Sequence, residues 1–202
     1  MCIRDRYAVD IKGLEVPGYD VRGCVGLALA YATADRGGDH LRAWTIAEEL
    51  ERPFAIEGKA RLVKELQDRN SAFWCLIGCD NILANTVGDP IKFVDYSISA
   101  LNVIGWKEVF GWEMDREKFL KIGERVYNLT HLFNLREGFT RTDDRLPERL
   151  KEPRQDTGWE ISNGDFEKMV TEYYSLRGWD NEGEPTPETL ARLQIEVDSK
   201  GG

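Results

Sequence analysis

The sequence has 202 residues, 42% of them hydrophobic, and a formal net charge of −9 at pH 7. This composition excludes wholesale disorder and is enough for one sizeable core or two small ones. Lysine and arginine form no cluster along the chain, and phosphate contacts need clustered positive charge. The composition therefore disfavours nucleic acid and anionic membranes as partners.

No stretch of the sequence approaches the length of a membrane-spanning helix, and the first residues lack the apolar core of a signal peptide. We therefore expect a cytoplasmic protein that does not enter membranes. The cysteines are Cys2, Cys24, Cys75 and Cys79. In a chain of this size without a secretion signal, reduced thiols or a metal site fit better than a disulfide framework.

Residues 1–6 show neither capping residues nor hydrophobic periodicity. We interpret them as a non-native leader and expect the natural protein to extend upstream. The next segment, residues 23–35, is rich in alanine and leucine and predicts a helix that ends at the glycine pair Gly37-Gly38.

Apolar spacing predicts further helices along the chain. One spans residue 59 to about residue 76, a second begins at Asp89-Pro90, and a third is capped by Asp115 and ends at Glu137-Gly138. The apolar positions on which these assignments rest are Leu62, Leu66, Phe73 and Leu76, then Ile91, Val94, Ile98 and Leu101, then Phe119, Ile122, Val126, Leu129 and Phe133.

Two more helices are predicted near the C-terminus, over residues 165–176 and from Thr186-Pro187 onward. No strand pattern of comparable strength is present, so the fold class is all-α, with five to seven helices and at most a minor sheet. The glycine- and proline-containing stretch 152–164 is the clearest linker. It divides the chain into a main helical domain, residues 7–151, and a linker with C-terminal helices, residues 152–202.

Three long segments, residues 16–43, 128–147 and 173–186, resemble the aldehyde:ferredoxin oxidoreductase family and follow the family's order. Their most characteristic runs are Val16-Pro17-Gly18-Tyr19-Asp20-Val21-Arg22-Gly23, Arg36-Gly37-Gly38-Asp39-His40-Leu41-Arg42-Ala43, Phe133-Asn134-Leu135-Arg136-Glu137-Gly138 and Tyr173-Tyr174-Ser175-Leu176-Arg177-Gly178-Trp179-Asp180. The resemblance implies the helical, C-terminal part of such an enzyme, without its N-terminal β-rich domain.

The same resemblance implies an oxidation of small aldehydes to carboxylic acids, with ferredoxin as electron acceptor. It also implies a tungsten, or in some relatives molybdenum, held by two pterin cofactors, a [4Fe-4S] cluster beside one pterin, and a homodimer. A close variant is a family member acting on another substrate, such as an aromatic-ring reductase subunit. Because both cofactors need the missing N-terminal part, we expect this chain alone to be inactive.

The resemblance places the family's isolated cluster cysteine at Cys79, a role that suits the preference of iron for thiolate. The family pattern before this cysteine is Asp-x-x-Gly-Leu-Cys, and its aspartate and leucine backbone bind the pterin. Here Trp74 stands at the aspartate position, and Ile77-Gly78 replaces the Gly-Leu pair. Trp74 and Gly78 are therefore the candidate pterin-binding residues, and Cys79 is the candidate metal ligand; the alternative for Cys79 is a buried free thiol.

His40 is the candidate catalytic residue, because histidine titrates near neutral pH and can move a proton during oxidation. The resemblance places it near the metal and substrate; the alternative is a histidine that caps local backbone. We interpret His131 and the pair Asp20 and Arg22 as structural.

Several other features favour packing or ion pairing over chemistry. Cys24 and Cys75 are weak ligand candidates, and the charged run at 136–144 predicts a salt-linked turn, although paired carboxylates can also do acid–base work. We also expect exposed apolar patches at residues 28–31 and 73–76, where the missing domain and the pterins would lie. The alternative function is a non-catalytic helical structural or interaction domain derived from the family, which purified protein free of iron would favour.

Overall fold

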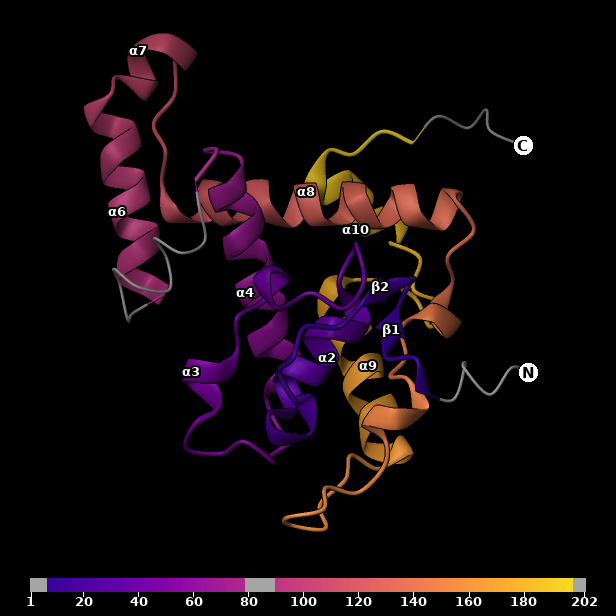
Figure 1. The fold of residues 1–202 in the computed structure, drawn as a ribbon. Helices are drawn as coiled ribbons and strands as arrows, with labels where there is room; N and C mark the ends of the chain where they lie inside the picture. The colour runs from indigo at the N-terminus through magenta and orange to yellow at the C-terminus, as the bar shows by residue number, and fades with distance from the viewer. Residues whose placement is uncertain (1–6, 79–89, 198–202) are drawn as a thin grey trace.

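The all-α prediction is confirmed by the computed structural model, which describes residues 7–78 and 90–197 (Figure 1). Within these residues lie eight α-helices rather than five to seven, because α3 and α7 are too short to leave a periodic signal. The helices are α2 (Val25–Thr33), α3 (Ile46–Glu49), α4 (Lys59–Trp74), α6 (Pro90–Val103), α7 (Trp106–Phe110), α8 (Arg116–Arg136), α9 (Asn163–Arg177) and α10 (Pro187–Leu193).

Strand structure in the described residues is minor, as expected. Strands β1 (Asp10–Ile11) and β2 (Leu14–Glu15) form one antiparallel hairpin in which Ile11 pairs with Leu14. Short 3-10 helices connect the longer elements; they are η1 (Val21–Gly23), η2 (His40–Arg42), η3 (Arg141–Asp143) and η4 (Glu148–Leu150). Among the described helices, none combines the length and the apolar character needed to cross a bilayer.

Side-chain caps fix several helix starts where the sequence predicted them. The carboxylate of Asp115 accepts a hydrogen bond from the backbone N–H of Lys118 at 2.9 Å, which begins α8. Thr186 caps α10 by accepting from the N–H of Thr189, with Pro187 in the first helical turn. These caps satisfy backbone donors that a helix leaves without partners at its N-terminus.

Helix α2 is buried along its whole length at the centre of the molecule. The fully buried carboxylate of Glu49 accepts from the N–H groups of Gly26 at 2.8 Å and Leu27 at 3.0 Å, and it pairs with Lys59 at 2.9 Å. A carboxylate is well placed at a helix N-terminus, where backbone donors point outward. The expected exposed patch at residues 28–31 is therefore wrong, because helices α4, α9 and α3 cover α2.

The second patch expected to be exposed, residues 73–76, is wrong at its first residue, Phe73. Phe73 is buried against Phe93 of α6, with ring centroids 4.7 Å apart. Trp74 and Leu76 are half-buried and Cys75 is exposed. The apolar surface at the end of α4 is therefore covered in part by α6.

Helices α4 and α8 form the most extensive helix pair and lie against one another near Gly123. A Cβ atom at Gly123 would collide with the backbone carbonyl of Asp68, so glycine permits the close approach. The predicted apolar stripe of α8 is only partly correct. Phe119 is buried, but Leu129 and Phe133 are 47% and 54% exposed, because the far half of α8 lacks a covering helix on that side.

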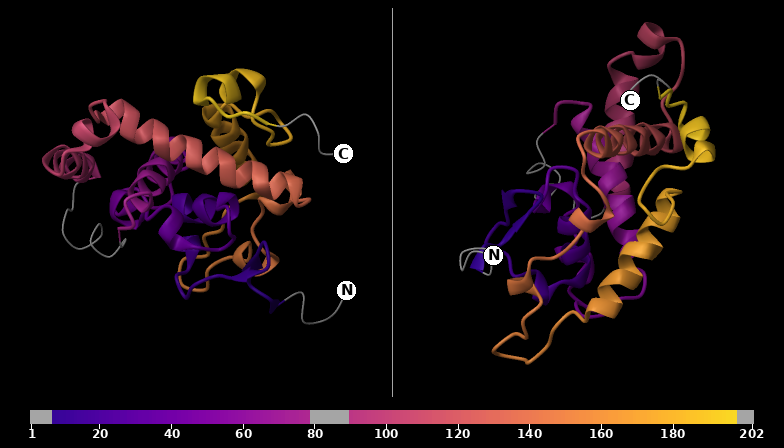
Figure 2. Two further views of the ribbon diagram at one scale, coloured as in Figure 1. Left: turned by 90° about the horizontal axis from the view of Figure 1, so that it is seen from above. Right: turned by 90° about the vertical axis from the view of Figure 1, so that its right-hand side faces the viewer.

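Helices α6 and α7 extend from one end of α8, away from the other helices (Figures 1 and 2). We call residues 90–112 the α6–α7 arm. At its base, buried side chains join the arm to α4 and α8; they are Ala72, Val94, Leu101, Met114 and Phe119. Towards its tip, Val103, Ile104 and Val109 are 85%, 73% and 72% exposed. The arm thus has its own small core and a largely apolar, exposed tip.

Helix α9 packs on α4 and α2 on the opposite side from the arm. Its Phe166, Met169, Val170 and Tyr173 belong to the same buried cluster as the side chains of α2. This places the segment after residue 152 in direct contact with α2 and α4.

Candidate functional site

The turn that carries His40 is built on two glycines and a carboxylate cap. Gly37 has φ +100, a conformation that favours glycine, and a Cβ at Gly37 or Gly38 would collide with the β1–β2 hairpin or with Val16 beyond it. Asp39 then caps the 3-10 helix η2 by accepting from the N–H of Leu41 at 2.9 Å. The local sequence therefore fixes the start of the turn.

His40 lies in an aromatic cluster on this turn. Its ring is 5.1 Å from that of Tyr19 and 5.0 Å from that of Trp44, both in edge-to-face geometry. The imidazole is half-buried and Tyr19 is 45% exposed. Nearby, burial and the neighbouring Asp39 and Tyr19 raise the pKa of the Tyr31 hydroxyl. That hydroxyl and the Thr45 hydroxyl are buried without a hydrogen-bond partner in the described structure.

Side chains from α4 hold the other end of the turn. The Nδ2 of Asn70 donates to the carbonyl of Leu41 at 2.8 Å and approaches that of Arg42 at 3.5 Å. The guanidinium of Arg42 lies 4.2 Å above the ring of Trp74 and pairs with Asp35 at 2.5 Å. The structure thereby brings the turn of His40 and Trp74 together, although 34 positions separate them.

Beyond Trp74 the chain leaves α4 through a tight turn that ends at Gly78. Ile77 has φ +58 and is 96% exposed, a conformation that is rare for a β-branched residue and marks stored strain. A Cβ at Gly78 would collide with the ring of Phe73, so only glycine fits there. Cys79, the candidate metal ligand, lies outside the described residues.

The two cysteines that the structure describes are free thiols. Cys75 donates to the carbonyl of Ser71 at 3.3 Å, and desolvation of its sulfur raises its pKa. Desolvation and the nearby Glu49 raise the pKa of Cys24. Over residues 7–78 and 90–197, no three His, Cys, Asp or Glu side chains converge on a metal-sized site.

His131 and Asp20 both make contacts of the kind expected for structural residues. His131 stacks on Trp179 with centroids 3.7 Å apart, and its Nε2 is 2.7 Å from the carbonyl of Gly183. Burial lowers the pKa of His131. Asp20 accepts from the backbone and the guanidinium of Arg22, which also donates to the carbonyl of Glu152 at 2.9 Å.

The charged run at 136–144 is a salt-linked turn, as predicted. Thr140 and Asp143 form a capping box, and Arg141 pairs with Glu167 of α9 at 3.0 Å. Asp144 is buried and accepts from Lys12 at 2.5 Å and from the hydroxyl of Tyr174 at 2.7 Å. Each of these carboxylates therefore has a hydrogen-bond or ion-pair partner.

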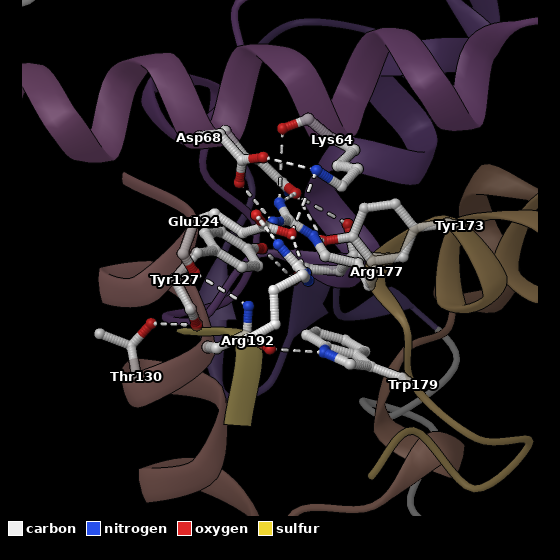
Figure 3. A network of polar contacts seen from close by, with 12 residues as sticks. Lys64, Asp68, Glu124, Tyr127, Thr130, Tyr173, Arg177, Trp179 and Arg192 are labelled. Carbon is white, nitrogen blue, oxygen red and sulfur yellow. Dashed lines mark hydrogen bonds and ion pairs between the residues drawn. The ribbon is translucent and has the colours of Figure 1, made fainter. Parts of the chain in front are cut away.

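A buried polar network surrounds Arg177, and the sequence did not predict it (Figure 3). Arg177 is fully buried, pairs with Asp68, and donates to Gln67 at 2.8 Å and to the hydroxyl of Tyr173 at 3.0 Å. Its guanidinium lies 4.1 Å above the ring of Tyr127. No local sequence signal marks this network, because Asp68 and Gln67 lie more than 100 positions before Arg177.

An open pocket of about 340 Å³ lies between α4 and α8 beside this network. Its lining side chains are Lys64, Glu65, Asp68, Glu117, Leu120, Lys121, Glu124 and Arg192. Arg192 donates to both oxygens of Glu124, at 2.8 and 2.9 Å. Burial acts to raise the pKa of Glu124, but Arg192, Lys64 and Arg177 outweigh it and hold the pKa at about 2. These pairs link α10 to α8 and α4.

Residues 2–195 match a protein family described as "Aldehyde ferredoxin oxidoreductase, domains 2 & 3". The tungsten-containing aldehyde ferredoxin oxidoreductase of Pyrococcus furiosus is 33% identical over 201 residues, and the match covers 93% of this chain. The enzyme of the same name from Thermococcus kodakarensis is 31% identical over 94% of this chain. The chain spans 31% of the length of these relatives.

One solved structure has a similar fold. The active-site complex BamBC of benzoyl coenzyme A reductase, in complex with 1,5-dienoyl-CoA, matches with a TM-score of 0.57 and 23% identity. The match covers 71% of this chain and 20% of that one. At this identity the likeness concerns the helical fold.

Proposed function

Because this chain belongs to the aldehyde ferredoxin oxidoreductase family, we propose that it forms the helical part of an enzyme that oxidises a small aldehyde to a carboxylic acid. The overall reaction consumes the aldehyde and one water and yields the acid, two protons and two electrons, with ferredoxin as the electron acceptor. The observation that carries this proposal is the family match over residues 2–195, which includes both the His40 turn and the end of α4.

The residues at the end of α4 are suited to form one part of a cofactor site whose other ligands lie elsewhere. Gly78 has room for no side chain against Phe73, and Ile77 is held exposed in a strained conformation. Trp74 and Gly78 would face the pterin, and Cys79 would bind the cluster. When bound, a tungsten bis-pterin centre supplies two-electron chemistry and a [4Fe-4S] cluster supplies one-electron transfer.

His40 would take up a proton released during the oxidation, at an imidazole nitrogen. An imidazole can do this near neutral pH without a large cost. The ring lies between Tyr19 and Trp44, and these edge contacts restrict its orientation. A fixed ring direction matters because proton transfer needs hydrogen-bond distance to the reacting group.

The proposal is tested on the native polypeptide that carries this sequence, purified without oxygen. We expect iron, tungsten or molybdenum, and aldehyde-dependent reduction of ferredoxin. His40→Gln should lower the rate at least 100-fold, the contribution typical of a general base of about 10²–10⁴-fold, and leave the metal content unchanged. Metal-free protein without activity would instead support a non-catalytic helical domain. Molybdenum in place of tungsten would change the identity of the metal and leave the rest of the proposal unchanged.

The cysteine assignment has a matched pair of variants. Cys79→Ala should lower the iron content or change the electron paramagnetic resonance of the reduced protein, because a cluster normally needs four thiolates. Cys75→Ala should change neither, because the Cys75 thiol is held by the carbonyl of Ser71. The reverse result would identify Cys75 as the ligand. A homodimer and a cytoplasmic location remain predictions for the same polypeptide.

A further inference from the structure

The His40 turn depends on a residue from another helix. Helix η2 is three residues long, and a 3-10 helix this short has few hydrogen bonds of its own. Asp39 caps its start, whereas the last carbonyls of so short a helix, those of Leu41 and Arg42, need partners from outside it. They accept from one side chain, the amide of Asn70 in the middle of α4.

Asn70 is an unusual residue for its place in the helix. It is 2% exposed, and a buried amide costs free energy unless it is hydrogen-bonded. Asparagine is also a poor helix former, so neither burial nor helix propensity accounts for it. Its contacts with the two carbonyls supply the missing reason.

The orientation of the Asn70 amide is set by its neighbour. The Nε of Arg69 donates to the Oδ1 of Asn70 at 3.2 Å. A guanidinium can only donate, so the oxygen must face Arg69 and the NH₂ must face the turn. The amide cannot flip without placing a carbonyl oxygen against the carbonyl of Leu41.

We propose that Asn70 is a positioning residue for His40, acting through the carbonyls of Leu41 and Arg42. It fixes the backbone that follows His40 and so holds the imidazole between Tyr19 and Trp44. The charged and titratable groups around the turn are Asp35, Arg36, Asp39, Arg42, Tyr19 and Tyr31. The effect of Asn70 on the reaction rests on the proposed catalytic role of His40. The contacts that position the His40 turn do not depend on that role.

The chain offers a matched test, because His40 and His131 are its two histidines. Asn128 is also a fully buried helical asparagine, and its Oδ1 accepts from Trp179, on which His131 stacks. Asn70→Leu and Asn128→Leu each keep the number and branching of the heavy side-chain atoms and remove the amide. The imidazole resonances of both histidines are followed by NMR from pH 5 to 8.5.

We expect Asn70→Leu to change the chemical shifts of His40 and to move its pKa by about 0.5 or more, a size typical of altered hydrogen bonding and charge. The His131 resonances should stay as in the unmodified chain, and Asn128→Leu should give the opposite pattern. A general loss of stability would change both histidines in both variants. Unchanged His40 signals in folded Asn70→Leu overturn the proposal.

If Asn70→Leu does not fold, Asn70→Gln replaces it, because the longer amide still donates but from a displaced position. Its His40 signals should then shift in part, and unchanged signals again overturn the proposal. In the native polypeptide, Asn70→Leu should shift the pH profile of aldehyde oxidation as it shifts the pKa of His40. If His40 moves with Asn70 but the polypeptide oxidises no aldehyde, the proposed function fails and the positioning role remains.

Discussion

The Arg177 network and the tip of the α6–α7 arm both depart from the usual rule that charged side chains are exposed and apolar side chains are buried. The network buries a full positive charge among Asp68, Gln67 and tyrosine hydroxyls, whereas the arm exposes Val103 and Ile104. In the network every polar group has a partner that holds it in one geometry. At the tip, apolar side chains have no covering layer within the described residues. Polar contacts thus join α4, α8 and α9 in the interior, whereas apolar side chains at the tip face solvent.

The largest effect is expected where the network loses its charge. Arg177→Met should lower the free energy of unfolding by about 3–5 kcal/mol, because the buried Asp68 then keeps only its ion pair with Lys64 at 2.8 Å. Urea unfolding followed by circular dichroism measures the change. The double variant Arg177→Met with Asp68→Asn should recover part of the loss. A cost below about 1 kcal/mol would mean that water already reaches Asp68.

A second test concerns the close approach of α4 and α8. Gly123→Ala should destabilise by about 1–3 kcal/mol, since its Cβ would press on the backbone carbonyl of Asp68. Helix propensity alone predicts a gain of about 1 kcal/mol from the same change. Gly164→Ala in the first turn of α9, where the Cβ has room, is the control and should be neutral or stabilising. A lower thermal midpoint for Gly123→Ala than for Gly164→Ala would support the close approach of α4 and α8. A higher one would contradict it.

The ion pairs beside the pocket predict a pH dependence. The pKa of Glu124 is about 2 in the folded chain against an ordinary value of 4.5. A depressed carboxyl pKa contributes stability that is fully present above pH 4.5 and is lost as the pH falls towards 2. Glu124→Gln should therefore lower the free energy of unfolding at pH 7 by about 1–2 kcal/mol, after allowing for solvent around Arg192. Denaturant unfolding measures this change. The variant's stability should also depend less on pH between 4.5 and 2, and an unchanged slope would contradict the assignment.

The smallest effect is expected at the arm's tip. Val103→Lys should change the free energy of unfolding by no more than about 0.5 kcal/mol, because the side chain is 85% exposed. Leu101→Ala, two positions earlier on the buried side of α6, is the contrast and should cost about 2–4 kcal/mol. Equal costs at the two positions would mean that the tip is covered in solution, for instance by a second copy of the chain.

Local signals in the sequence predicted local structure well. Asp115 and Thr186 cap helices because a cap depends on residues two or three positions away. The structural role of Asp20 with Arg22 follows the same logic. Helices α3 and α7 escaped because four or five residues do not complete a periodic pattern. Leu129 and Phe133 fit the apolar period of α8, but which side of a helix is covered depends on elements distant in the sequence.

The candidate site shows the same limit. His40 and Trp74 were selected from the sequence separately, and their proximity comes from Asn70 and Arg42, whose partners lie in other elements. The burial of α2 was not predicted because its alanine-rich sequence suits an interface and an interior equally. Residues that act across such distances, Arg177 above all, are visible only once the helices are placed.

The distance between Asp68 and Arg177 also has a consequence in time. The two residues are 109 positions apart, and a ribosome adds about 5–20 residues per second. Asp68 is therefore synthesised roughly 5–20 s before its partner exists. Throughout that interval α4 can form, and Lys64, four positions earlier in the same helix, is the ion-pair partner that Asp68 already has. The second partner of this carboxylate, and with it the ion pair that ties α9 to α4, is added only when α9 has been made.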